Sequence, residues 1–434
     1  MGKSYHLISL GCSKNLVDSE VMGYRLERKY TFTDDPASAD VIVVNTCGFI
    51  QPAKEESIET ILEMAQLKKP GAKLVVTGCF SQRYQKELPE EIPEVDLWTG
   101  VGEFHIIDQL IEKGVKSYFT NRTFLIGREE RTIFNSPYHA YIKLGEGCNQ
   151  KCSFCAIPSF KGRLQSRPIP VILDEVNRLK ERGYRDFTFI SQDSSSYGRD
   201  WGERGKLEEL IEELDKISDI TGRILYLYPQ TTTPTLIEKI ANSPTLATYY
   251  DLPIQHISPK VLKLMGRGDG SAERHLLEIM ERQPEGFIGT SIIVGHPGEG
   301  EREFEELKNF LSAFPFDRIN IFQYSDEEGT KSSTLPEKVP PEVVEERIAQ
   351  LEEIVHKKEV ERKARWVGKV LEGYLEGETP DGLFYSLRPT IFAPEIDGDI
   401  LINEIETTRP LQIGARYRVK ITQQAGRELL GTLI

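Results

Sequence analysis

The sequence predicts a three-part α/β protein, in which a parallel sheet domain is followed by a partial barrel of six β/α units and a small β-barrel. Short apolar runs alternate with polar helical stretches up to about residue 118, and the same alternation starts again at residue 138. From residue 366 onward, short β-prone runs are broken by glycine and proline. Alternating strands and helices are typical of parallel sheets, and a group of short strands is typical of a small barrel.

These changes of pattern divide the chain into four segments. We expect an N-terminal α/β domain, a connecting segment, a barrel and a C-terminal β domain at residues 1–118, 119–137, 138–365 and 366–434, respectively. Near the end of the barrel, Pro340 and Pro341 open a long charged segment whose apolar residues recur at helical spacing. This spacing predicts a helix that packs one face against the barrel.

Three strands of the first domain are each followed by a cysteine. The strands are expected at residues 6–10, 41–45 and 74–77, and the cysteines are Cys12, Cys47 and Cys79. Because the carboxyl ends of parallel strands meet at one edge of a sheet, we expect the three thiols to converge there. The alternative is that they are small buried hydrophobic residues, as free cysteines often are. Their positions in glycine-marked turns beyond the strands favour a three-cysteine cluster site.

Six further strands predict the partial barrel, at residues 140–144, 186–191, 224–228, 249–254, 289–294 and 320–324. In barrels of this kind the loops after the strands carry the chemistry. The loop after the first strand holds the other three cysteines, Cys148, Cys152 and Cys155. Each later loop brings polar residues to the same rim, so we expect the site to lie there.

The spacing of Cys148, Cys152 and Cys155 is Cys-x3-Cys-x2-Cys, which is typical of a site-differentiated iron-sulfur cluster. Three thiolates leave one iron of a four-iron cubane free to bind a small molecule. Structural zinc is the alternative, and it needs a fourth ligand such as His139 or His256. Disulfides are not expected, because pairing within so short a loop would strain the bridge geometry.

Composition describes an ordinary globular protein of 434 residues with a formal net charge of −14. The first ten residues lack the apolar core of a signal peptide, and no run approaches the roughly 18 to 20 apolar residues that span a bilayer. We therefore expect a cytoplasmic location and no membrane partner. Residues 367–434 carry seven Lys or Arg and ten Asp or Glu. Since phosphate-binding surfaces are basic, direct tRNA binding is not expected, and a basic protein partner is favoured.

Residues 148–155, CNQKCSFC, resemble the signature of the radical S-adenosylmethionine (SAM) enzymes, with the aromatic Phe154 at its penultimate position. Together with the N-terminal cysteines, the six-unit barrel and a C-terminal domain similar to TRAM domains, the chain resembles the methylthiotransferases from end to end. Residues 9–20, 45–50 and 156–162 are similar to the branch that acts on an aspartate of the small-subunit ribosomal protein S12. His296 and Ser13 depart from the usual residues of that family.

The resemblance implies two 4Fe-4S clusters and SAM as cofactors. One SAM, bound at the Cys148 triad, yields a 5′-deoxyadenosyl radical on reduction, and a second methylates sulfur held at the Cys12 triad. The radical then takes a hydrogen from the substrate β-carbon, which accepts the methylthio group. A one-electron donor such as flavodoxin or ferredoxin is implied as a partner, beside ribosomal protein S12.

Position at the rim and resemblance together suggest SAM contacts. They are Phe154, Gln192, Asp193, Gln255, Val294 and Gly295. Two other functions stay open from the residues: a tRNA adenosine methylthiotransferase with the same clusters, and a non-catalytic metal-binding scaffold associated with the ribosome.

Overall fold

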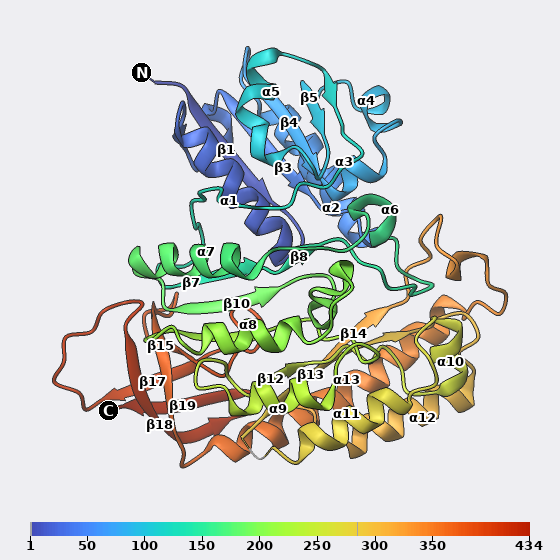
Figure 1. Cartoon of the computed structure of the whole chain (residues 1–434), viewed down its shortest axis with the longest axis vertical. Helices are drawn as coiled ribbons and strands as arrows, with labels where there is room; N and C mark the ends of the chain where they lie inside the picture. The colour runs from blue at the N-terminus through green and yellow to red at the C-terminus, as the bar shows by residue number, and fades with distance from the viewer. Residues whose placement is uncertain (1, 284) are drawn as a thin grey trace.

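The computed structural model describes residues 2–283 and 285–434. The N-terminal domain, the partial barrel and the C-terminal β-barrel follow one another in space as they do along the chain, with the first domain at the top of Figure 1 and the last at the lower left. This arrangement confirms the predicted three-part α/β fold.

The N-terminal domain is a six-stranded parallel sheet in the order β2-β1-β3-β4-β5-β6. Its strands are β1 (Ser4–Ser9), β2 (Thr31–Phe32), β3 (Val41–Thr46), β4 (Lys73–Gly78), β5 (Leu97–Thr99) and β6 (Ser117–Tyr118). Its helices are α1 (Ser13–Glu27), α2 (Gln51–Leu67), α3 (Cys79–Arg83), α4 (Leu88–Glu91) and α5 (Ile107–Lys113). The central strand β3 is buried along its whole length, as expected for a strand covered by helices on both faces.

The partial barrel contains two three-stranded parallel sheets, in the orders β7-β10-β11 and β12-β13-β14. Its strands are β7 (His139–Lys143), β10 (Asp186–Ile190), β11 (Thr221–Ile224), β12 (Tyr249–Asp251), β13 (Phe287–Val294) and β14 (Arg318–Gln323). An isolated bridge between Gly222 and Leu246, and a bond from the Leu227 amide to the Asp251 carbonyl (2.9 Å), join the two sheets. The six predicted strands are therefore all present, in the predicted order.

Helices accompany the strands of this barrel, and the first of them packs against α3 of the N-terminal domain. They are α6 (Ile157–Lys161), α7 (Ile169–Glu181), α8 (Lys206–Leu214), α9 (Pro234–Asn242), α10 (Pro259–Leu264), α11 (Ser271–Glu281), α12 (Glu301–Ala313) and α13 (Pro341–Lys363). A short hairpin of β8 (Gly145–Glu146) and β9 (Gln165–Ser166) follows the first strand. The predicted charged helix is α13, which packs beside β14 and buries Val344, Leu351 and Val355.

Two barrel strands end well before their expected bounds. The fourth, β12, stops at Asp251 instead of residue 254, and the third differs for a backbone reason. Residues 224–228 were expected to form the third strand, but β11 spans Thr221–Ile224 and stops there. Tyr226 has a φ of +64°, a left-handed conformation that an extended strand does not contain. The chain therefore turns at Tyr226 and brings its side chain to the rim of the barrel.

The C-terminal domain is a closed five-stranded barrel in the order β15-β16-β17-β19-β18. Its strands are β15 (Val370–Glu378), β16 (Tyr385–Pro389), β17 (Ile400–Ile405), β18 (Arg416–Ala425) and β19 (Glu428–Leu433). The predicted small barrel is confirmed. In the last strand, Val419 packs close against Gly431.

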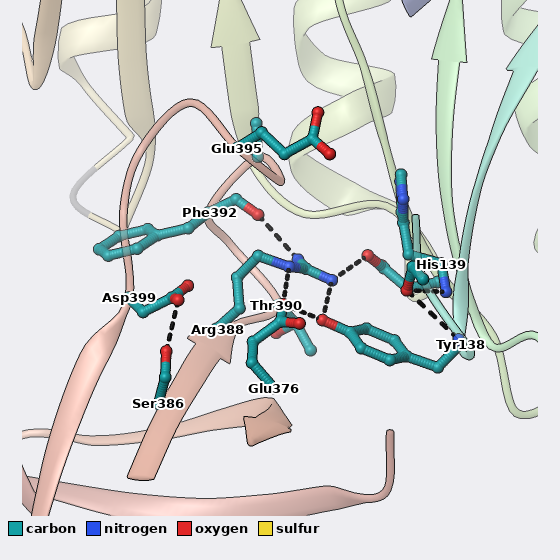
Figure 2. Close-up of polar contacts among 12 residues, drawn as sticks. Tyr138, His139, Glu376, Ser386, Arg388, Thr390, Phe392, Glu395 and Asp399 are labelled. Atoms are coloured by element: carbon teal, nitrogen blue, oxygen red, sulfur yellow. Dashed lines mark hydrogen bonds and ion pairs between the residues drawn. The ribbon is translucent and has the colours of Figure 1, made fainter. Parts of the chain in front are cut away.

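This small barrel docks on the end of the partial barrel where the strands begin. Arg388 of β16 bonds Asp186, the first residue of β10, and the hydroxyl of Tyr138 (Figure 2). Asp397 in the same way bonds Arg318, the first residue of β14 (3.0 Å). The N-terminal domain lies at the opposite end, where Lys54 and Arg83 both pair with Glu327. Among the described residues, no helix is long and apolar enough to cross a membrane.

Candidate active site

A single cavity of about 470 Å³ lies between the N-terminal domain and the ends of the barrel strands. All six cysteines of the chain line it, and all six are free. Two groups of cysteines that are far apart in the sequence thus face one space. The predicted convergence of the three strand-end cysteines occurs in the folded chain, and the structure adds that the compact triad faces the same cavity.

The dispersed triad is formed by three turns of the N-terminal sheet. Cys12 is the N-cap of α1, Cys47 follows β3, and Cys79 is the first residue of α3. The side-chain amide of Asn15 ties these turns together, because it donates to the carbonyls of Leu10 (3.2 Å) and Thr46 (2.9 Å), while its oxygen accepts from Cys79 Sγ (3.5 Å).

Gly11 lets the first two cysteines approach each other. Its φ is +84°, and a Cβ atom built there would lie 2.8 Å from Cys47 Sγ and 2.6 Å from Cys47 Cβ. A side chain at this position would therefore collide with Cys47 and would also strain the backbone. The glycine that marked this turn in the sequence is needed for the geometry of the site.

The compact triad lies on the loop after β7. The Gln150 amide donates to Cys148 Sγ (3.4 Å), and the Cys155 amide donates to the Cys152 carbonyl (3.2 Å). Cys152 Sγ lies 3.7 Å from both Arg267 Nη1 and the Tyr228 hydroxyl. The Arg267 guanidinium also stacks over the Tyr228 ring, so a positive charge is fixed beside this sulfur.

Burial favours the neutral form of these thiols. It raises the pKa of Cys79 and of Cys155 to about 12 and that of Cys148 to about 11. Desolvated thiols of this kind ionise when a cation binds the sulfur, as iron does in a cluster. Among the described residues, no three His, Cys, Asp or Glu surround a point suited to one metal ion. Thiolates that bind separate irons of a cubane do not have to meet at one point, so the two triads fit clusters.

The two histidines that could complete a zinc site are engaged elsewhere. His139 is buried and lies 2.9 Å from the Thr188 hydroxyl, and His256 Nδ1 accepts from the Ser258 amide (2.9 Å). Neither of them lines the cavity. The fourth donor that structural zinc needs is therefore not supplied by either residue.

The suggested SAM contacts divide into two groups. Phe154, Gln192 and Gln255 line the cavity, whereas Asp193, Val294 and Gly295 do not. Asp193 is buried and accepts from the Gln150 side chain (2.7 Å), which does line the cavity. Val294 lies in the barrel core, and a Cβ at Gly295 would meet Val344 of α13 at 2.5 Å. The contact expected from Val294 and Gly295 is through their backbone groups, and it stays a prediction because the direction of the side chains does not decide it.

Several lining residues had no signal of their own in the sequence. They include Lys14, Tyr226, Arg267 and Asn320. Arg267 follows α10 instead of a strand, so a search limited to strand ends could not find it. The buried charge cluster behind the cavity could not be predicted either, because its members are far apart in the sequence. Asp18 of α1 reaches Lys143 (2.6 Å) and Lys161 (3.5 Å) of the barrel.

Comparison with known protein families agrees with this division of the chain. Residues 4–100 match "Uncharacterized protein family UPF0004", residues 142–311 match "Radical SAM superfamily" and residues 367–434 match "TRAM domain". The structure of TsrM from Kitasatospora setae, a radical S-adenosylmethionine methyltransferase, is similar in fold, with a TM-score of 0.52 at 14% identity over 74% of this chain and 73% of that one. The fold and domain content are those of a radical SAM protein with added UPF0004 and TRAM domains.

Sequence relatives narrow this class to one family. The chain is 53% identical to the ribosomal protein uS12 methylthiotransferase RimO of a Nitratiruptor species, over all of both chains. It is 50% identical to the protein of the same name from Aliarcobacter butzleri, over 100% of this chain and 98% of that one. The chain therefore belongs to the RimO family of radical SAM methylthiotransferases.

Proposed function

We propose that this protein transfers a methylthio group to the β-carbon of an aspartate in ribosomal protein uS12. The observation that carries the proposal is the cavity between the first two domains, which is lined by six free cysteines in two triads. A site that makes a radical and a site that stores the transferred sulfur must both reach the same substrate carbon. One shared cavity meets that requirement.

Each triad holds one 4Fe-4S cluster in this proposal. Cys148, Cys152 and Cys155 hold the cluster that binds SAM, and the other triad, Cys12, Cys47 and Cys79, holds the sulfur-carrying cluster. When bound, these cofactors supply the one-electron cleavage of SAM and the methylated sulfur, chemistry that amino acid side chains lack. We also propose a one-electron donor such as flavodoxin or ferredoxin, and action in the cytoplasm, where a ribosomal substrate is found.

The protein's own part is to bind, orient and exclude water. Phe154, Gln192 and Gln255 line the cavity on the barrel side and are the proposed SAM contacts. The Arg267 guanidinium beside Cys152 balances the negative charge of thiolates at the compact triad. The two ion pairs of Glu327 with Lys54 and Arg83 hold the N-terminal domain over the barrel, so that a radical formed in the cavity is shielded from solvent.

We retain the division into 1–118, 119–137, 138–365 and 366–434 as the proposed domain limits. The last strand of the first sheet, β6, ends at Tyr118, and β7 starts the barrel at His139, which supports the first two limits. The acidic balance of residues 367–434 favours a basic protein over tRNA as the substrate.

Anaerobic reconstitution followed by mass spectrometry of uS12 tests the function. We expect about eight irons per chain, four for each cubane, and a mass gain of one methylthio group on a single aspartate after SAM and reductant are added. Zinc uptake without SAM cleavage would instead support the scaffold. Modification of tRNA with uS12 unchanged would support the adenosine-modifying enzyme.

A further inference from the structure

Four cationic side chains line the cavity, and they differ in whether a carboxylate neutralises them. They are Lys14, Lys161, Arg267 and Arg318. Arg318 pairs with Asp251 and Asp397, and Lys161 lies 3.5 Å from each of Asp18 and Glu146. Lys14 and Arg267 have no carboxylate within ion-pair distance among the residues that the structure describes.

Arg267 already contacts a cysteine sulfur of the compact triad. Its guanidinium bonds the Pro253 carbonyl (2.5 Å), lies 3.7 Å from Cys152 Sγ and stacks on Tyr228. The two carboxylates that line the cavity are also neutralised, since Asp251 pairs with Arg318 and Glu327 pairs with Lys54 and Arg83. Of the two cations that no carboxylate neutralises, Lys14 is therefore the one whose role the compact triad does not explain.

Lys14 is buried and has no ion-pair partner among the described residues, although Tyr226 hydrogen-bonds it and the more distant Glu146 attracts it. Only 8% of its surface is exposed, and its Nζ lies 3.6 Å from the ring centroid of Tyr226. It is the second residue of α1, which begins without a side-chain cap and without an acidic residue in its first turn. The positive end of the helix thus adds to the charge of the ammonium. The aromatic ring attracts the ammonium without neutralising it, so this point of the cavity favours an anion.

We propose that Lys14 is the residue that receives the carboxylate of the substrate aspartate. This inference rests on the proposed function and adds a specificity-determining residue to it. The side-chain carboxylate is bonded directly to the β-carbon that accepts sulfur, so an ammonium that binds it also fixes the position of that carbon. Lys14 comes from the N-terminal domain and Tyr226 from the barrel, which places this subsite at the boundary that carries the two triads.

An alternative role for the Lys14 ammonium predicts a different experimental result. Cys12 is two residues from Lys14, so the ammonium could serve only to balance the thiolates of the dispersed triad. That role predicts altered iron or sulfur retention without any change in how the enzyme distinguishes aspartate from asparagine. The carboxylate role predicts the reverse.

The test compares the binding of two forms of uS12 to the reconstituted holoenzyme. One form has the aspartate that carries the methylthio group in the mass spectrum, and the other has asparagine there. We expect the wild-type enzyme to bind the aspartate form about tenfold more tightly, the order expected for a hydrogen bond to a charged group. Lys14→Met should reduce this ratio to about one, and Lys14→Arg should keep most of it.

Lys29→Met is the matched control. It removes one positive charge, paired with Glu112, just beyond the far end of α1, a helix of about 22 Å, and should leave the ratio unchanged. Iron content is measured for every variant. If Lys14→Met does not load iron, Lys14→Gln and Lys14→Arg decide the question, because only the second keeps the charge.

An unchanged aspartate-to-asparagine ratio in Lys14→Met or Lys14→Gln would overturn the inference while leaving the proposed function intact. Loss of iron or of stored sulfur with an unchanged ratio would assign Lys14 to the dispersed triad. If wild-type enzyme does not modify uS12 at all, the proposed function fails, and this inference fails with it.

Discussion

Arg388 of the C-terminal barrel donates from Nη2 to Oδ2 of Asp186, the first residue of β10, at 2.7 Å. Both side chains are buried, and Arg223 binds the same carboxylate from β11. Burial alone would raise the pKa of Asp186, but the two guanidinium groups outweigh it and hold this pKa below its ordinary value. The TRAM domain is thus attached to the barrel by a charge cluster that water does not reach.

Replacing Arg388 with methionine should lower the free energy of unfolding of the whole chain. The change removes one partner each from the Asp186 carboxylate, which keeps Arg223, and the Tyr138 hydroxyl, which keeps Glu376. Breaking a buried pair destabilises by about 3 to 5 kcal/mol, and the remaining partners should hold the loss to the lower end of that range. Chemical denaturation should show a lower midpoint for the whole chain. Arg416→Met, at an exposed position of β18, is the control and should change stability by less than about 0.5 kcal/mol. Equal midpoints for the two variants would contradict the role of the cluster.

Cys47→Ala should abolish methylthio transfer while leaving SAM cleavage intact. The compact triad is untouched, so reduction should still cleave SAM to methionine and 5′-deoxyadenosine, while no methylthio group reaches uS12. Iron should fall by about four per chain, the content of one cubane. Full transfer by this variant would refute the role of the dispersed triad.

Gly11→Ala should damage the dispersed triad without removing a cysteine. The new Cβ would lie 2.8 Å from Cys47 Sγ, so the turn must shift. Gly71→Ala is a matched control, because Gly71 has nearly the same φ (+83°) with nothing within 4 Å of the added Cβ. We expect both variants to share the backbone strain and only Gly11→Ala to lose iron from the dispersed triad. Similar iron content in the two would show that the contact with Cys47 is tolerated.

His256 should contribute a loss of stability in mild acid, against the opposite contribution of buried carboxylates such as Glu299, whose pKa is raised. Burial lowers the pKa of His256 from about 6.5 to about 3. The unfolded chain therefore binds more protons between these values, so stability falls as the pH falls through this window, by about 2 kcal/mol at pH 5 for this group. His256→Asn keeps an acceptor for the Ser258 amide and should flatten the pH dependence measured by denaturation. His356→Asn, on the exposed face of α13, should not.

The sequence came close to the fold because most of its elements are marked locally. The first-domain strands at residues 41–45 and 74–77 are apolar runs bounded by turn residues, and β3 and β4 coincide with them to within one residue at each end. The third barrel strand was misplaced because the left-handed turn at Tyr226 has no glycine to mark it.

Only part of the candidate site could likewise be predicted from the sequence. The cysteines were predictable because their positions follow from a motif and from strand ends, which are properties of neighbouring residues. Asp193, Val294 and Gly295 were named from the same strand-end rule, but whether a side chain at a strand end faces the cavity or the helix layer depends on the direction it takes there. Gly295 faces Val344 of α13, a residue 49 positions later in the sequence.

The sequence by itself determined the three-part fold, the two cysteine triads and the resemblance to methylthiotransferases, because periodicity, turn residues and motif spacing act over short distances along the chain. Only the tertiary structure decided which charges reach the cavity and which of them are neutralised. Lys14 and Lys161 are both lysines near a cysteine in the sequence, yet only Lys161 lies beside Asp18 and Glu146. The net charge of a buried site is set by distances between residues far apart in the chain, and these exist only once the domains have packed.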